Sequence, residues 1–179
     1  MKRRIAPVGS DLMRRLAFIE LMELLEFSVL RLDSPAHGAR ASRDAGLIGT
    51  LDWWFPDPQP PQDAHAQSLE GHTVYIFSTA AALRDAVLPS DDTVVHFDSP
   101  ADVCAPGPDG ETSGIRMVAK TRGKSVAAPR PQAGRPPFLR VDVNTLLRRV
   151  VVPRGLPQHL FDVVSSLVRS RVWVDVVRP

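Results

Sequence analysis

The chain has 179 residues, of which 44% are apolar and 23% charged, as is typical of a globular domain with a sizeable core. Its net charge of +2 is unevenly spread: residues 1–100 hold 9 basic and 14 acidic side chains, whereas residues 101–179 hold 13 and 6. The single cysteine excludes a disulfide framework and a cysteine-based zinc site, and no apolar run approaches the roughly 20 residues needed to span a bilayer.

The N-terminal segment is predicted to begin with a flexible basic tail, residues 1–9, followed by a single domain over residues 10–179. No continuous apolar stretch follows the first basic residues, so the start does not read as a Sec signal peptide. A helix is predicted from Ser10-Asp11, a suitable N-cap, to about Phe27, because apolar residues recur near helical spacing. We expect this helix to pack on the domain.

Residues 28–33 are predicted to form a strand, with Arg31 inside the apolar run VLRL and Asp33-Ser34 directly after it. A buried guanidinium without an anionic partner is costly. The partner of Arg31 is therefore either a carboxylate of the protein, on Asp33 or on the preceding helix, or an anionic group of a ligand.

The next segment contains Trp53-Trp54 and then four prolines within six positions, and it is predicted to be an ordered loop or the rim of a cleft. The section 104–137 is predicted to be mobile apart from one short strand, since Pro, Gly and basic residues dominate it. The other predicted elements are a strand in HTVYIFST, a helix over Ala80–Val87, strands in TVVHFDS, GIRMVAK and FLRVDV, a strand or helix in LLRRVVV, a helix over Leu156–Val168, and a closing strand in RVWVDVV.

Two of these segments carry motifs. VLRLDSP followed by AGLIG resembles the first signature of the mono-ADP-ribosyltransferases of the cholera-toxin and pertussis-toxin type, a strand with arginine usually written Tyr-Arg-x-Asp-Ser-Arg-Pro-Pro. Arg31, Asp33, Ser34 and Pro35 match, whereas the expected aromatic and the second arginine are replaced.

VYIFSTAAALRDA resembles the second signature of that family, a strand that ends in Ser-Thr-Ser and turns into a helix. Ser78 and Thr79 match, and the separation of 47 residues from Arg31 to Ser78 falls within the family's range. His65, upstream of this strand, corresponds to a histidine of the family, and GLPQHLF resembles its Gly-Ile-Pro phrase.

The resemblance covers about residues 28–165 and implies NAD as the substrate that donates ADP-ribose. It assigns NAD binding to Arg31, Asp33, Ser78 and Thr79, and it implies that the arginine strand and the Ser-Thr strand lie side by side. An arginine fork suits the pyrophosphate of NAD, because it can bind phosphate oxygens bidentately.

The third signature of the family, Glu or Gln, any residue, then Glu, is missing. Its expected position holds Leu147, Arg148 and Arg149. A carboxylate beside the ribose stabilises positive charge when the nicotinamide–ribose bond breaks. Asp142 is the nearest acid on a predicted strand, so the resemblance leaves Asp142, with His65, as the candidate catalytic residues.

These observations together predict an α+β fold, a mixed β-sandwich of the ADP-ribosyltransferase type with an N-terminal helix. The expected function is that of a bacterial toxin or type III secreted effector, which transfers ADP-ribose from NAD to a host protein and enters the host cell without a Sec signal, or otherwise stays cytoplasmic. The alternatives are a catalytically degenerate fold that binds a protein or peptide, and a nucleic-acid-binding protein. The basic loop over residues 120–135 favours nucleic-acid binding only weakly, because it has no interleaved aromatic residues. We expect a monomer without a metal.

Overall fold

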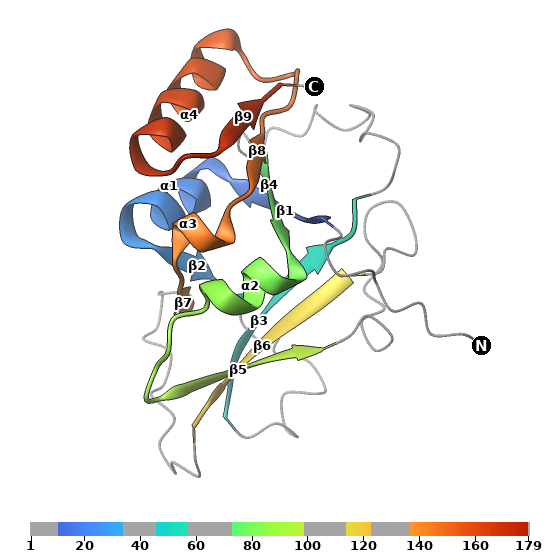
Figure 1. The fold of residues 1–179 in the computed structure, drawn as a ribbon, viewed down its shortest axis with the longest axis vertical. Helices are drawn as coiled ribbons and strands as arrows, with labels where there is room; N and C mark the ends of the chain where they lie inside the picture. The colour runs from blue at the N-terminus through green and yellow to red at the C-terminus, as the bar shows by residue number, and fades with distance from the viewer. Residues whose placement is uncertain (1–10, 34–45, 57–72, 99–113, 123–136, 179) are drawn as a thin grey trace, which may run out of the picture.

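The computed structural model describes residues 11–33, 46–56, 73–98, 114–122 and 137–178, and all structural statements refer to these ranges. Four helices and nine strands fall within them (Figure 1). The strands are β1 Asp11–Ala17, β2 Val29–Arg31, β3 Leu47–Trp54, β4 Thr73–Thr79, β5 Thr93–Asp98, β6 Gly114–Thr121, β7 Phe138–Arg140, β8 Arg149–Val151 and β9 Asp175–Val177. The helices are α1 Phe18–Phe27, α2 Ala80–Ala86, α3 Val143–Leu146 and α4 Gln158–Arg171. The expected mixed α+β class is confirmed.

Seven strands form one sheet, in the order β5-β6-β3-β1-β4-β8-β9. The pairing is antiparallel except between β8 and β9, which run parallel. β2 and β7 form a separate two-stranded sheet. The centre of the large sheet is therefore β1, which lies between β3 and β4.

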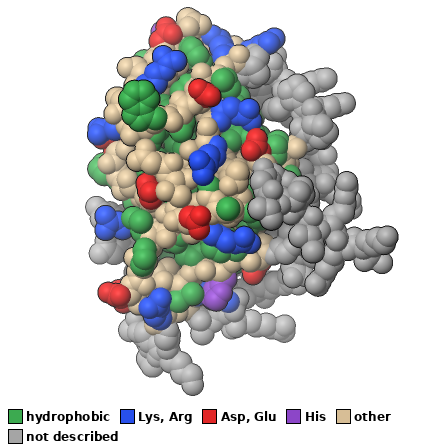
Figure 2. Space-filling view, viewed as in Figure 1, with side chains coloured by type: hydrophobic (Ala, Val, Ile, Leu, Met, Phe, Trp, Pro, Cys, Tyr) green, Lys and Arg blue, Asp and Glu red, His purple; other side chains and the backbone are tan. Residues whose placement is uncertain are grey.

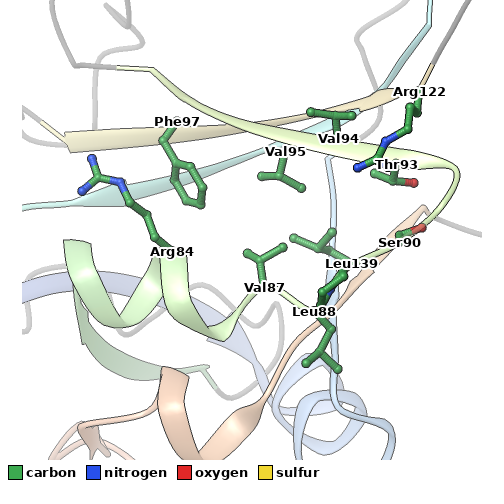
Figure 3. Close-up of a pocket in the computed structure, with 11 residues that line it drawn as sticks. Arg84, Val87, Leu88, Ser90, Thr93, Val94, Val95, Phe97, Arg122 and Leu139 are labelled. Atoms are coloured by element: carbon green, nitrogen blue, oxygen red, sulfur yellow. The ribbon is translucent and has the colours of Figure 1, made fainter.

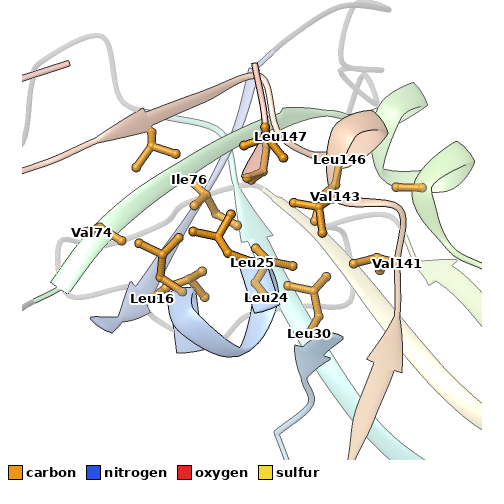
Figure 4. Packing of buried hydrophobic residues seen from close by; sticks show 14 of the residues in the cluster. Leu16, Leu24, Leu25, Leu30, Val74, Ile76, Val141, Val143, Leu146 and Leu147 are labelled. Carbon is orange, nitrogen blue, oxygen red and sulfur yellow. The ribbon is translucent and has the colours of Figure 1, made fainter. Parts of the chain in front are cut away.

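The core lies between the large sheet and the helices that cover one of its faces. Leu24 and Leu25 of α1 converge on Leu16 of β1 and on Val74 and Ile76 of β4, and all five side chains are buried (Figure 4). Leu21, Leu24 and Leu25 recur at helical spacing on α1, whereas the buried residues of β4 are partly alternating, as a strand with one covered face requires. α3 closes the same core with Val143 and Leu146.

The prediction of a helix from residue 10 is wrong for its first part, since β1 occupies Asp11–Ala17. Leu12, Arg14 and Leu16 are buried while their neighbours are more exposed, which is a period of two rather than 3.6. The helix begins only at Phe18, where the Glu20 carboxylate accepts a hydrogen bond from the Ala17 amide at 2.8 Å. The apolar residues of this segment fit a period of two as well as one of 3.6, so the sequence pattern alone does not distinguish a strand from a helix.

The prediction of a loop around Trp53-Trp54 is also wrong, because these residues end strand β3. Trp53 is fully buried, and β3 pairs with β6 on one side and with β1 on the other. The prolines had suggested irregular backbone, but the first of them, Pro56, lies beyond the end of the strand.

Most other predictions of local structure are confirmed. HTVYIFST and the helix after it correspond to β4 and α2, TVVHFDS to β5, GIRMVAK to β6, and Leu156–Val168 to the larger part of α4. LLRRVVV is resolved in favour of a strand, β8. Only the start of FLRVDV is a strand, since Asp142 is the N-cap residue of α3, and only the end of RVWVDVV forms β9.

Within these ranges, no helix is both long and apolar enough to cross a membrane. The described residues also bring no three His, Cys, Asp or Glu side chains together in a way that could hold a metal ion.

Candidate functional site

The Ser-Thr motif lies at the end of β4, and both hydroxyl groups have structural partners. Ser78 is fully buried, and its Oγ donates a hydrogen bond to the carbonyl oxygen of Leu146 at 2.7 Å. Thr79 is the N-cap residue of α2, where its Oγ1 accepts from the Ala82 amide at 3.1 Å. Ser78 thus joins β4 to α3, and Thr79 fixes the start of α2.

Arg31 has its anionic partner within the protein. Its Nη2 and Nε donate to the two carboxylate oxygens of Glu23, at 2.6 and 3.2 Å, with both side chains about one-third exposed. Ser28 makes this pairing possible, because it ends α1 with left-handed backbone at φ 55° and turns the chain into β2. The guanidinium fork of Arg31 is therefore already occupied by a carboxylate of α1.

The expected pairing of the Arg31 strand with the Ser-Thr strand is not formed. β2 pairs with β7, whereas the neighbours of β4 are β1 and β8. In the sequence, α1 separates the run VLRL from β1, and the helix packs against both β1 and β2.

The strand that does flank β4 carries a different arginine, Arg14. Leu12 is opposite Ser78 and Arg14 is opposite Ile76, so alternation along the two strands places Arg14 and Ser78 on the same, core-facing side of the sheet. The side chain of Arg14 is only 8% exposed. An arginine thus lies on the core face of the strand beside the Ser-Thr strand.

The guanidinium of Arg14 is only partly satisfied. Its Nη1 donates to the backbone carbonyl oxygen of Asp52 at 2.9 Å, whereas its Nε has no hydrogen-bond partner among the described residues. Burial lowers the pKa of Arg14, although nearby carboxylates, Asp33 first among them, oppose that shift. A cation held in this way has spare hydrogen-bonding capacity for an anion.

Two aspartates define the surroundings of Arg14. The Asp52 carboxylate is taken by Arg116, whose Nε and Nη2 donate to it at 2.7 and 2.8 Å and whose pKa this hydrogen bonding raises. The Asp33 carboxylate lies 3.9 Å from Arg14 Nη2 and is 68% exposed. We refer to Arg14, Asp33, Asp52 and Arg116 as the Arg14 cluster, in which Asp33 is the loosely held member.

Asp33 is fixed through its backbone rather than its side chain. Its amide and carbonyl groups exchange hydrogen bonds with Thr50 of β3, at 2.8 and 3.1 Å. This pairing holds Asp33 near Arg14 and leaves its carboxylate free to turn into solvent.

Of the two candidate catalytic residues from the sequence, only Asp142 is among the described residues, and it does not join the Arg14 cluster. His65 lies outside the described residues. Asp142 caps α3, and its carboxylate accepts hydrogen bonds from the Thr145 hydroxyl at 2.6 Å and the Asn144 amide at 3.1 Å. The hydrogen bond from Thr145 lowers the pKa of Asp142.

Asp142 lies at the far end of α2 from Thr79 and one turn of α3 before Leu146, the hydrogen-bond partner of Ser78. Its amide donates to the carbonyl oxygen of Ala86, which ends α2, whereas Thr79 begins that helix. A helix of seven residues separates the two ends by about 10 Å.

The position expected to hold the family's glutamate belongs to β8, where Arg149 is opposite Phe77. The Arg149 guanidinium lies 4.4 Å from the centroid of the Phe77 ring, and its Nη2 is 3.4 Å from a carboxylate oxygen of Asp11. Asp11 is itself opposite Thr79. A carboxylate is therefore present at the end of the Ser-Thr strand, but it comes from β1 and is bound to an arginine.

A small hollow of about 230 Å³ lies away from these residues, between α2, β5 and the segment that connects them (Figure 3). Val87, Val95 and Leu139 form its apolar part, and Arg84 and Arg122 lie at its two ends. Neither Arg14 nor Ser78 lines it, and its volume falls below the roughly 300 Å³ at which ligand pockets usually begin.

Arg14 and Asp11 are the residues that the sequence interpretation had missed as site candidates. Both lie in the segment predicted as a helix from Ser10-Asp11 to about Phe27, with Asp11 in its N-cap. The signal that could have identified Arg14 is its place in Leu-Met-Arg-Arg-Leu, where it occupies the alternating position between two leucines.

No family model and no curated protein matches the sequence. Among solved structures, the chain is similar to DarT of Thermus sp. 2.9 in complex with NAD+, with 11% sequence identity and a TM-score of 0.47 over 97% of this chain and 98% of that one. The complex of the same DarT with carba-NAD+ gives 12% identity and a TM-score of 0.47 over 97% of each chain. A similarity of this size carries no conclusion about ligand or activity.

Proposed function

We propose that the protein binds NAD and transfers its ADP-ribose, with Arg14 rather than Arg31 as the arginine that binds the phosphates. The observation that carries this proposal is the pairing of β1 with β4, which puts a buried, partly satisfied arginine on the strand next to Ser78-Thr79. The family resemblance requires an arginine strand in that position, and the motif VLRLDSP does not supply it.

The residues of the Arg14 cluster fit an anionic ligand. Arg14 has one strong hydrogen bond and a loose carboxylate neighbour, so a phosphate oxygen can replace Asp33 at its Nη2 without breaking the bond to the Asp52 carbonyl group. Charge-assisted bonds from a guanidinium to phosphate are stronger than neutral ones. NAD bound in this way would supply the ribose–nicotinamide bond that is to be cleaved. Ser78 and Thr79 would hold the backbone at the end of β4 in place through their hydrogen bonds to α3 and α2.

The proposal also includes the molecule that accepts ADP-ribose and the way in which the protein reaches it. As expected from the sequence, we propose that the acceptor is a host protein and that the chain is a secreted bacterial effector. Transfer of label from radioactive NAD to proteins of a host-cell extract tests the acceptor. Label on added nucleic acid and not on protein would exclude a protein acceptor.

A second candidate function is binding without turnover. It is favoured by β8, where Arg149 stands at the expected glutamate position and binds the Asp11 carboxylate. A carboxylate that already neutralises an arginine stabilises positive charge on a ribose less well.

The test is calorimetry with NAD on the wild type and on three variants. Asp33→Asn should bind NAD more tightly, because the competing charge is gone and Asp33 contributes to the fold through its backbone. Arg14→Lys should weaken binding by about 1–3 kcal/mol, because the planar fork is lost. Arg31→Lys is the matched control, and it should leave binding unchanged.

Equal effects of Arg14→Lys and Arg31→Lys, or no response to Asp33→Asn, would contradict the assignment to Arg14. Release of nicotinamide, measured by chromatography, then separates transfer from binding alone. Asp11→Asn and Asp142→Asn should be compared with Glu70→Gln and Glu111→Gln, whose glutamates lie outside the described residues. Release abolished by one variant identifies the acid.

A further inference from the structure

A second cluster of unpaired groups lies at the edge of the large sheet that β9 forms, where α4 is followed by that strand (Figure 1). Trp173 lies in this connection and is fully exposed, which is unusual for the largest apolar side chain. Val172 before it is buried and Val174 after it is half-buried, so the extended backbone directs Trp173 outward. A position directed into water is normally polar, and burial does not account for a tryptophan there.

Two arginines lie close to Trp173. An open hollow of about 520 Å³ is lined by Trp173, by Arg148 at the entry to β8 and by Arg169 in the last turn of α4. The guanidinium groups of Arg148 and Arg169 have no hydrogen bond, ion pair or ring contact with another described residue. Nearby Arg149 and Arg171, in contrast, are paired with carboxylates.

The residues that line the hollow indicate which kind of partner this cluster can bind. Around Trp173 the hollow is lined by charged groups, including Asp175, and by only two valines, so it lacks the apolar rim of a protein–protein hot spot. Residues 137–178 contain 7 arginines and 3 aspartates, which makes this part of the chain basic. On the face that Figure 2 shows, acidic and basic side chains are interspersed, so a broad basic surface is absent there and attraction for a polyanion has to be local.

We propose that Trp173, Arg148 and Arg169 form a contact site for single-stranded nucleic acid. An exposed indole ring provides a stacking surface for an unpaired base, and two free guanidinium groups bind the phosphates on either side. The hollow is open, which suits a strand that passes over it better than a small molecule that must be enclosed. This site is separate from the Arg14 cluster and does not depend on NAD binding.

The experiment is a titration of the full chain with an oligothymidylate of about 12 nucleotides, followed by tryptophan fluorescence. Of the three tryptophans, Trp53 is buried and Trp54 is half-buried, so acrylamide should mainly quench the fluorescence of Trp173. A base that stacks on Trp173 should quench this same acrylamide-accessible part of the fluorescence. Trp173→Ala should weaken binding roughly 5- to 150-fold, and Trp173→Phe should restore much of it. Because Trp173 is exposed, these variants should fold.

Salt dependence tests the arginines. Arg148→Gln and Arg169→Gln should each reduce the slope of log K against log salt by about 0.7, the value for one phosphate on a single strand. Arg140→Gln is the matched control, since Arg140 is exposed, lies on β7 and also lacks a side-chain partner among the described residues.

Three outcomes would overturn the proposal. They are no binding of the oligonucleotide, equal slopes in Arg140→Gln and the two test variants, and unchanged affinity in Trp173→Ala. Stronger binding of a polyglutamate peptide or of phosphatidylserine vesicles than of the oligonucleotide would likewise reject it and assign the site to that partner.

Discussion

Replacing Arg14 by methionine should separate a functional arginine from a structural one. The side chain is 8% exposed, and taking a guanidinium out of water costs several kcal/mol. Against that cost, Arg14 makes one hydrogen bond to a backbone carbonyl group, worth about 1.5–3 kcal/mol, and one loose ion pair to an exposed carboxylate, worth less than about 1 kcal/mol. Methionine is unbranched and of similar length, so it can fill the space among Leu12, Leu16 and Ile76.

Arg14→Met should therefore leave the free energy of unfolding unchanged or raise it by up to about 2 kcal/mol, while NAD binding is lost. The assay is urea unfolding, read from the midpoint at constant slope, alongside calorimetry with NAD. A loss of more than about 2 kcal/mol in Arg14→Met would refute the reasoning, because it would mean that the fold, and not a ligand, requires the guanidinium. Improved stability with unchanged NAD binding would refute the functional half.

Other substitutions probe the surrounding structure. Ser78→Ala should destabilise by about 1–3 kcal/mol in urea unfolding, because it leaves a buried carbonyl group of α3 without its donor, whereas Thr79→Ala should cost about 0.5–2 kcal/mol through the lost N-cap. Thr145→Val should raise the pKa of Asp142 in an NMR titration, since the Thr145 hydroxyl is the main cause of its lowering. That lowered pKa stabilises the fold above the ordinary value of 3.8 and ceases to do so as the pH falls through the folded-state pKa, so the stability difference between Thr145→Val and wild type should vanish in acid. Arg31→Met should cost no more than about 1 kcal/mol, because its ion pair with α1 is partly exposed.

Much of the fold could be predicted from local patterns. β4 and α2 follow from a β-branched run that ends in a threonine suited to capping, and α4 from its amphipathic spacing. The N-terminal segment could not be assigned from its pattern, because Leu12 and Leu16 are four residues apart and satisfy both a helical and an alternating pattern. Pairing with β4 along its whole length decides in favour of a strand, and that is a tertiary effect.

The site was less predictable than the fold, for a physical reason. A motif identifies residue types in order, but it does not say which strands become neighbours. Arg31 has the expected sequence context, yet Glu23, eight residues earlier, meets it because Ser28 reverses the chain between them. Arg14 has no motif around it and acquires its position only when β1 enters the sheet between β3 and β4.

Binding and turnover depend on different parts of this arrangement. Binding of a phosphate needs a cation with spare donors, which Arg14 provides on the core face of β1. Cleavage of the ribose–nicotinamide bond needs a free carboxylate, and Asp11, the carboxylate opposite Thr79, is neutralised by Arg149 and lies on the other face of the sheet from Arg14. Under the proposal that NAD binds at Arg14, the described residues support binding more directly than turnover, because the Asp11 carboxylate is paired with Arg149 and the Asp142 carboxylate caps α3.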